Sequence, residues 1–375
     1  MISFSRRTLF RLKLSTALVG SLLAGRLSAE LPGNYSIPIG NVPATNPVVT
    51  ATDNGAGLPL AINATDIPPA NYENLAIQLR RGNTVLNWGS FNLTDSIDGQ
   101  ASTLAFTSTV GPASVLNRVT SGSLSTIQGA ITATPDVAVW LVNTSGITVG
   151  AGGSFNGAAL VLSASDILPA DFDNVLLPNK PLTGVNTAAP ISLTGAGALT
   201  ATGSIIVVGQ AITADKAMTS TSGEIALIAA RDLTLPISLG SPLAITITKG
   251  TNLGTAVNIG AALSGQSVRI VGAGEGGAIA SLLNINAGGL LTATAANGVV
   301  VLATQTTAAA GVTISSAAAV DGISVGDALT ASGAGGDIVL SATGALTSTG
   351  TITASDSVDA NAATVNLTKD RKSVV

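Results

Sequence analysis

Short apolar segments recur along the chain, separated by Gly, Asn and Asp, with Ile, Val, Leu and Ala alternating with Thr and Ser. Units that begin with Gly appear at 223–227, 298–302 and 336–340, and residues 191–205 and 338–352 are identical at nine of fifteen positions. A turn of about 20 residues built from such short strands is typical of a parallel β-helix. Apolar side chains would point inward, and Thr, Ser and Gly outward.

We therefore predict an all-β chain that folds as a right-handed, single-stranded parallel β-helix with an amino-terminal cap. At about 20 residues per turn, the residues after 30 would form about 17 turns, and a strand spacing of about 4.8 Å gives a rod about 80 Å long. The alternative is a β-sandwich of irregular hairpins. It is disfavoured because few Asn-Gly or Asp-Gly turn signals separate the strands.

Composition excludes several kinds of chemistry. The 375 residues include 43 Gly but no Cys and no His, and only 10% are charged whereas 46% are apolar. Without Cys or His there is no disulfide framework, no Cys or His metal site and no nucleophile that depends on either residue. The high apolar content argues against disorder. We expect no cofactor and no bound metal.

The first 29 residues differ from the rest. Four basic residues within 6–13 precede an apolar stretch at 14–24, and Ala29 supplies a small residue at a cleavage position. This pattern predicts a secretory signal peptide, although Ser5-Arg6-Arg7 also resembles a twin-arginine signal. Cleavage there would leave 11 basic and 20 acidic residues, a net charge of −9. That balance argues against a nucleic-acid partner.

Five segments carry a family resemblance. They are NWGSFNL at 87–93, VLNRVT at 115–120, STIQG at 125–129, VWLVNTSGITVG at 139–150 and NGAALVLSASDI at 156–167. In order and spacing they resemble the secretion domain of two-partner secretion exoproteins, the filamentous haemagglutinin family. The positions that match its motifs most clearly are Trp88, Phe91, Asn117, Arg118, Val119 and Gly129.

One segment departs from that family. The turn that the family builds as Asn-Pro-Asn-Gly is here Asn143-Thr144-Ser145-Gly146, followed by Ile147. Asn can hydrogen-bond its own backbone and Gly accepts a positive φ, so a tight turn is still expected. The structural interpretation of Asn143 and Gly146 is favoured over direct contact with a transporter, and both stay open.

The resemblance implies both organisation and function. Residues 1–29 would be the signal peptide, 30–180 the secretion-domain signature with the β-helix cap, and 181–375 further β-helix repeats. The chain would cross to the periplasm of a Gram-negative bacterium, where the periplasmic domains of an outer-membrane transporter would recognise it. At the cell surface it would act as an adhesin with a host-cell or glycan ligand. The alternatives are an envelope or passenger β-helix without a dedicated transporter and a β-helical polysaccharide-active enzyme.

Several individual residues allow two interpretations. Trp88, Phe91 and Trp140 either close the end of the solenoid, which is favoured, or form an exposed platform for sugar rings. Arg118 pairs with an acid or covers a strand edge. An enzyme would need clustered acids, for which Asp166, Asp171 and Asp173 are the nearest candidates, and a turn or a weak cation contact is favoured for them. We expect no catalysis. Thr-x-Thr fragments recur too irregularly to line one face.

The carboxy-terminal residues Asp370 to Val375 contain no aromatic or amphipathic cap. An uncapped solenoid end predicts that the chain is a fragment or self-associates through its open strand edge.

Overall fold

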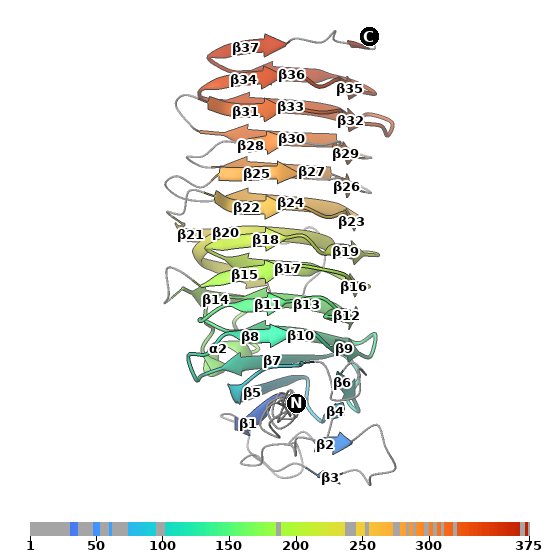
Figure 1. Ribbon diagram of the computed structural model, residues 1–375, viewed down its shortest axis with the longest axis vertical. Coiled ribbons are helices and arrows are strands. Elements are labelled where there is room, and N and C mark those ends of the chain that lie inside the picture. Colours follow the sequence, from blue (N-terminus) through green and yellow to red (C-terminus); the bar gives the residue numbers. More distant parts are fainter. Residues whose placement is uncertain are drawn as a thin grey trace, which may run out of the picture.

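Three long sheets run along a rod, and successive coils of the chain add a strand to each of them (Figure 1). The computed structural model describes residues 31–36, 48–52, 60–61, 74–94, 102–184, 189–236, 245–251, 255–272, 278–282, 285–287, 290–295, 300–302, 306–308, 311–317, 321–367 and 372–373. The expected signal peptide at 1–29 and most of the expected open end at 370–375 lie outside these residues. None of the described helices is long and apolar enough to cross a membrane.

The first sheet faces one side of the rod. Its strands, in spatial order, are β1 (Gly33–Ser36), β5 (Asn83–Ser90), β7 (Ala113–Val119), β10 (Val137–Val142), β13 (Ala159–Ser163), β17 (Ile205–Gly209), β20 (Glu224–Pro236), β24 (Ser267–Gly272), β27 (Leu290–Ala295), β30 (Gly311–Ser316), β33 (Asp337–Ala342) and β36 (Val358–Asn361).

The second and third sheets complete the coil. The second contains β8 (Ser125–Ile127), β11 (Ile147–Val149), β15 (Pro190–Leu193), β18 (Ala211–Ala214), β22 (Thr255–Ile259), β25 (Ala278–Leu282), β28 (Val300–Leu302), β31 (Asp321–Val325), β34 (Ala345–Ser348) and β37 (Thr364–Leu367). The third contains β3 (Leu60–Ala61), β2 (Val48–Thr52), β4 (Asn74–Leu79), β6 (Thr103–Ser108), β9 (Ala130–Ala133), β12 (Ser154–Gly157), β16 (Ala198–Ala201), β19 (Ala217–Ser220), β23 (Leu263–Gly265), β26 (Ile285–Ala287), β29 (Thr306–Ala308), β32 (Leu329–Ala331), β35 (Ile352–Ala354) and β38 (Lys372–Ser373).

The register confirms the predicted parallel β-helix. Strands of successive coils pair in parallel, as where Ile205 of β17 lies beside Ile225 of β20. In β24, Val268 and Ile270 point into the rod while Ser267, Arg269 and Val271 are partly exposed. This is the alternation expected of a strand with one buried face. Like side chains stack on like from coil to coil, so a single apolar core runs along the interior.

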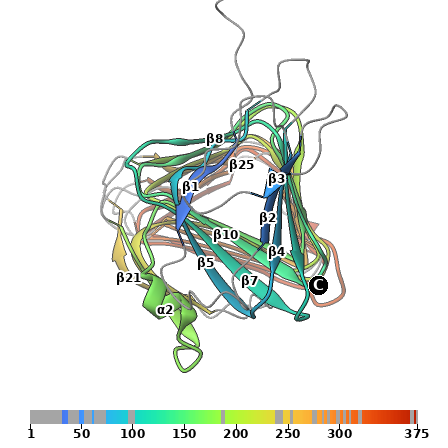
Figure 2. The same cartoon turned by 90° about the horizontal axis from the view of Figure 1, so that it is seen from below.

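Antiparallel strands close the amino-terminal end, where the sequence predicted a cap. β1 pairs antiparallel with β5, and β2 pairs antiparallel with both β3 and β4. Figure 2 looks along the rod from this end and shows β1 beside β5, and β2 and β3 beside β4, at the near end of the walls. The change from antiparallel to parallel pairing begins at β5 and β4, which each have a parallel neighbour on their other side.

An outer layer covers part of the first sheet. It consists of α2 (Pro169–Asp173), β14 (Asn179–Thr183), the carboxy-terminal half of β20 and β21 (Thr246–Gly250), with β14 and β21 both antiparallel to β20. Figure 2 shows α2 and β21 outside the ring of strands. These residues belong to two long segments that leave the coil, one between β13 and β15 and one between β20 and β22. Each coil adds one strand to the second sheet, which has 10 strands in the described residues, whereas about 17 turns were expected from the length.

Beneath this layer lies a second apolar core, separate from the interior one. Its members point outward from the first sheet or inward from the layer: Val85, Leu116, Trp140, Val142, Ala159, Val161, Ile167, Phe172, Leu182, Ile206, Val208, Ala226, Ile228, Ala230, Leu233 and Leu235. Strands β13 and β17 are consequently buried at every position, unlike β24. The first sheet is thus covered on both faces over its amino-terminal coils.

Candidate functional site

A buried hydrogen-bonded chain joins two of the family-motif positions, Trp88 and Asn117, to Trp140 across adjacent strands. Trp88 Nε1 in β5 donates a hydrogen bond to Asn117 Oδ1 in β7 at 3.0 Å, and Asn117 Nδ2 donates to the backbone carbonyl of Trp140 in β10 at 3.2 Å. Asn117 is fully buried, so its amide satisfies groups that water cannot reach. These residues fix the register of the first three parallel strands of the sheet.

The three aromatic residues are buried, so the interpretation as an exposed sugar platform is wrong. Trp88 and Phe91 are each 1% exposed and meet edge to face in the interior core, with ring centroids 5.6 Å apart. They lie at the amino-terminal end, next to the antiparallel cap. Trp140 does not close that end: it points into the second core and meets Phe172 of α2 edge to face at 5.5 Å.

Asn143 forms a turn that ties coils together. Its side-chain Nδ2 donates to Ser123 O and to Ser125 Oγ, both at 2.8 Å, and its Oδ1 accepts from the Ser145 backbone N–H at 2.9 Å. Its own backbone N–H donates to Ser163 O in the following coil. Asn143 and Ile147 are buried, whereas Thr144 and Ser145 are half-buried.

Two motif positions require glycine, because a Cβ at either position would clash with a neighbouring backbone oxygen. Gly146 has a φ of +108°, and a Cβ there would lie 2.7 Å from Pro190 O of the next coil. At Gly129 a Cβ would lie 2.1 Å from Ser102 O, closer than real Cβ atoms come. Gly129 therefore permits the close approach of neighbouring coils, and Gly146 permits both that approach and a left-handed backbone.

Arg118 pairs with an acid, one of the two roles predicted for it. Its Nε and Nη2 donate to Asp166 Oδ1 and Oδ2 at 2.7 and 2.6 Å, a bidentate geometry that joins β7 to the segment before α2. This hydrogen bond to Asp166 raises the pKa of Arg118 above its ordinary value, against the opposing effect of burial. The neighbouring motif residue Val119 is buried in the interior core.

Further contacts hold α2 against the sheet. Arg81, which precedes β5, forms an ion pair with Asp173, and Asn83 Nδ2 donates to Phe172 O at 3.4 Å. Lys180 is fully buried and its Nζ donates to the backbone carbonyls of Asp171 and Asn174 at 2.9 and 2.7 Å. Burial lowers the pKa of Lys180, although Asp171 and Asp173 favour its charged form.

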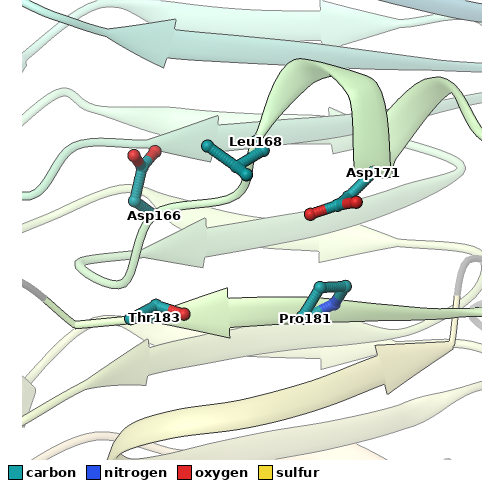
Figure 3. A pocket seen from close by; sticks show the side chains of 5 residues that line it. All are labelled: Asp166, Leu168, Asp171, Pro181 and Thr183. Atoms are coloured by element: carbon teal, nitrogen blue, oxygen red, sulfur yellow. The ribbon is translucent and has the colours of Figure 1, made fainter.

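A pocket opens between α2 and β14. It encloses about 300 Å³ and is lined by Asp166, Leu168, Asp171, Pro181 and Thr183. Figure 3 shows the Asp171 carboxylate projecting from α2 towards the strand that carries Pro181 and Thr183. Asp166 contributes a carboxylate already bound to Arg118. The pocket therefore has an apolar wall and two carboxylates. The Asp171 carboxylate, unlike that of Asp166, accepts no hydrogen bond from the described residues.

The three candidate acids make different contacts. Asp166 binds Arg118 and Asp173 binds Arg81, while Asp171 lines the pocket. Within the described residues no group of three or more His, Cys, Asp or Glu side chains is placed to hold a metal ion. The arrangement is one of structural ion pairs around α2 and supplies no pair of free carboxylates for hydrolysis.

A polar row on the third sheet was not foreseen. The Thr-x-Thr fragments at 132–134, 246–248 and 292–294 fall on different sheets, as their irregular spacing suggested. Single residues from successive coils nevertheless share one register position along the third sheet: Thr132, Asn156, Thr200, Thr219, Ser264, Asn286, Thr307, Thr330 and Thr353. Only the strand pairing shows this row, because unequal turn lengths hide it in the sequence.

These features define a β-helical repeat protein whose amino-terminal coils form a capped, doubly covered domain. The family model of the TPS secretion domain, the secretion domain of two-partner secretion, matches residues 71–313. The chain belongs to this family and carries the amino-terminal domain of a two-partner secretion exoprotein, as residues 87–167 suggested. Exoproteins of this family pass through the periplasm to the cell surface of Gram-negative bacteria.

Solved structures of similar proteins were also found. The secretion domain of HMW1 from Haemophilus influenzae is 18% identical with a TM-score of 0.44, over 89% of this chain and 83% of that one. The filamentous hemagglutinin secretion domain is 14% identical with a TM-score of 0.47, over 84% of this chain and 99% of that one. No curated protein sequence matches the chain.

Proposed function

We propose that the amino-terminal coils are recognised by an outer-membrane transporter during export, and that the rod then acts as an adhesin-like protein at the cell surface. The match of the secretion-domain family to residues 71–313 carries this proposal. That range begins just before β4 and includes all of the outer layer. The doubly covered sheet and the motif turn thus belong to the part of the chain that the transporter would handle, whereas the cap strands β1, β2 and β3 precede the matched range.

The fold supports folding coil by coil outside the cell. Each new coil places strands on the open edges of three existing sheets, so its backbone groups find partners at once. It also buries an apolar row against the preceding coil, at about 25 cal/mol per Å² of apolar surface. Such steps are favourable without nucleotide hydrolysis, which the chain could not use outside the cell.

The turn 143–147 would act mainly through the structure that it builds. Asn143, Gly146 and Ile147 are buried, so in the folded chain a transporter could reach only the half-buried Thr144 and Ser145. Recognition of this motif, together with Trp88, Phe91, Asn117, Arg118, Val119 and Gly129, would therefore take place before these coils close.

Adhesion is supported by the long exposed sides of the rod. The register row on the third sheet presents a hydroxyl or amide side chain in one coil after another, at a strand spacing of about 4.8 Å. A repeated row of hydrogen-bonding groups suits an extended polar ligand such as a surface glycan. Binding of the secreted chain to glycan arrays and host cells would test this part of the proposal.

Secretion assays test the transporter dependence directly. The chain is expressed in a Gram-negative host with and without the transporter encoded beside its gene, and protease-resistant protein is measured in the medium. Release only with the transporter supports the proposal. Equal release without it would contradict the proposal and favour a passenger or envelope β-helix. The enzyme alternative would require activity on polysaccharides that is lost in Asp166→Asn or Asp171→Asn variants.

A further inference from the structure

A groove separate from the pocket beside α2 runs along the corner where the chain passes from the third sheet to the first. It encloses about 490 Å³ and lies over four successive connections, β4–β5, β6–β7, β9–β10 and β12–β13, which contribute Gly82, Pro112, Asp136 and Ala158. Sites for small molecules typically enclose about 300–1,000 Å³. Because neighbouring strands are about 4.8 Å apart, this corner groove is long enough for an extended ligand.

Three side chains supply polar groups to the corner groove. Asp136 Oδ1 accepts a hydrogen bond from Thr134 Oγ1 at 2.6 Å, and its Oδ2 accepts none from the described part of the chain. Ser114 Oγ has no partner there either, and Asn83 uses only its Nδ2, which donates to Phe172 O at 3.4 Å. A carboxylate, a hydroxyl and an amide oxygen with unused bonding capacity can each bind a hydroxyl group of a ligand.

The remaining lining is apolar and made of small side chains. Pro112 and Pro135 are exposed, and the other apolar members include Ala138 and Ala158. Sites that combine an apolar lining with a few placed polar groups are typical for small ligands. A sugar chain matches this combination, because each ring has C–H groups on its faces and hydroxyl groups at its edge.

A protein segment fits the corner groove less well. The backbone there is already paired, since Ala113 N donates to Asp136 O at 3.0 Å and Ser114 N donates to Gly82 O at 2.7 Å. An extended peptide would therefore find no open strand edge to join. The described residues that line the groove also include no aromatic or Arg side chain, the types that usually anchor protein interfaces.

The charge of the lining indicates the class of sugar. Asp136 is the charged side chain among the described residues of the groove, and the exposed cations Arg80 and Lys249 do not line it. Arg81, which precedes β5, is held by Asp173. A carboxylate accepts hydrogen bonds from hydroxyl groups but repels the sulfate or carboxylate groups of acidic sugars. The groove therefore favours an uncharged ligand.

We propose that the corner groove binds an uncharged oligosaccharide, with its hydroxyl groups bonded to the Asp136 carboxylate, Ser114 Oγ and Asn83 Oδ1. The assignment rests on the proposed adhesin function and adds both a site and the class of glycan. It concerns the folded chain outside the cell, so it does not depend on how the transporter recognises the chain during export.

Glycan binding by the secreted full chain tests the site. The chain is applied to an array of neutral oligosaccharides of glucose, galactose and N-acetylglucosamine, and of the sialylated and sulfated forms of the same sugars. Neutral members should bind, and their charged forms should bind at least about tenfold more weakly. The neutral member that binds best is then titrated against variants in a calorimeter, and thermal unfolding checks that each variant is folded.

The variants separate the corner groove from other surfaces. Asp136→Ala, which removes the carboxylate, and Ser114→Leu, which fills the groove, should each weaken binding about tenfold. Asp136→Asn keeps a partner for Thr134 and should reduce the preference for neutral over charged forms, which a loss of folding would not do. Asp356→Ala, at an exposed acid elsewhere, and Thr330→Ala, in the polar row of the third sheet, should leave binding unchanged.

The contrary outcomes are distinct. Equal binding of neutral and acidic forms, or no binding of any neutral oligosaccharide, would overturn the assignment. Binding that is lost in Thr330→Ala but kept in the groove variants would place the glycan on the polar row, and the adhesin function would stand without this site. Attachment to host cells without any glycan binding would mean a protein ligand, which again contradicts the site alone. Release without the transporter would contradict the secretion part of the proposed function and leave the glycan result unaffected.

Discussion

Asn143 connects coils that are consecutive along the rod. Its amide binds Ser123 and Ser125 in the preceding coil, and its backbone N–H binds Ser163 in the next one. The sequence predicted the turn, because Asn and Gly at its two ends are typical of tight turns. It could not predict the bonds between coils, because these depend on which residues the register brings opposite each other.

Asn143→Ala should destabilise the protein by about 1–3 kcal/mol, because the buried Ser125 Oγ, the Ser123 carbonyl and the Ser145 N–H all lose their partner. Denaturant unfolding would measure this as a lower midpoint with an unchanged slope. Thr144→Ala is the matched control in the same turn, with an expected change within about 0.5 kcal/mol. An Asn143→Ala chain of wild-type stability that is no longer secreted would show that the motif is read by the transporter directly.

Lys216 gives the stability a distinct pH dependence. It is buried, its Nζ donates to the carbonyls of Gly195 and Ala196, and burial lowers its pKa below the ordinary value. Between the lowered folded pKa and the unfolded value of about 10.4, the unfolded chain binds more protons than the folded one. Stability therefore rises with pH across that window, by at most about 1.4 kcal/mol per pH unit from this group.

Lys216→Met should remove this contribution while keeping the length of the side chain. Unfolding free energies of both proteins are compared from pH 8 to 10.5, and the difference between wild type and variant should shift in favour of the wild type as pH rises. Lys180 and all other titrating groups are present in both proteins and cancel in the difference. A difference that is constant over this range would mean that burial does not perturb Lys216.

At the scale of elements, the alternation of apolar and polar residues identified the strands but not the outer layer that covers the first sheet. Apolar residues are continuous at Ile205–Gly209 of β17 and alternate in β24, so the sequence did contain a sign that the outer face of β17 is buried. What could not be foreseen is the cover itself. The helix α2 has only five residues and no apolar periodicity, and β14 pairs with β20 across a long sequence separation.

Phe172→Ala should release the outer layer while leaving the interior core intact. The substitution removes the contact with Trp140 and a large side chain from the second core, a change that typically costs about 3–5 kcal/mol. Hydrogen exchange of β14 and the carboxy-terminal half of β20 should accelerate, whereas β27 and β33 keep their protection. Leu168→Ala, at an exposed neighbouring site, should change neither. Equal loss of protection along the rod would mean that the layer and the coils form one cooperative unit.

At the scale of the whole molecule, the fold class followed from repetition and the number of coils did not. Dividing the length by about 20 assumed that every residue belongs to a coil. Val208 of β17 pairs with Ile228 one short turn later, but Ser163 pairs with Val208 across the excursion that carries α2 and β14. Two such excursions and the antiparallel cap use chain that adds no parallel coil. Composition alone cannot distinguish them from the repeats.

Because the first sheet is buried on both faces in the amino-terminal coils, these coils should be more stable than the carboxy-terminal ones. In a solenoid, stability is close to a sum of coil and neighbour contributions, so a local defect need not unfold distant coils. Leu227 of β20 and Leu340 of β33 are both fully buried in the interior core, but only β20 also contributes to the second core. Leu340→Ala, at a cost of about 2–5 kcal/mol, should therefore unfold the carboxy-terminal coils alone. Limited proteolysis would then yield a resistant amino-terminal fragment ending beyond β24, whereas Leu227→Ala should lower the resistance of that fragment itself. If Leu340→Ala makes the whole chain equally sensitive, the rod unfolds as one unit and the outer layer does not set its order of unfolding.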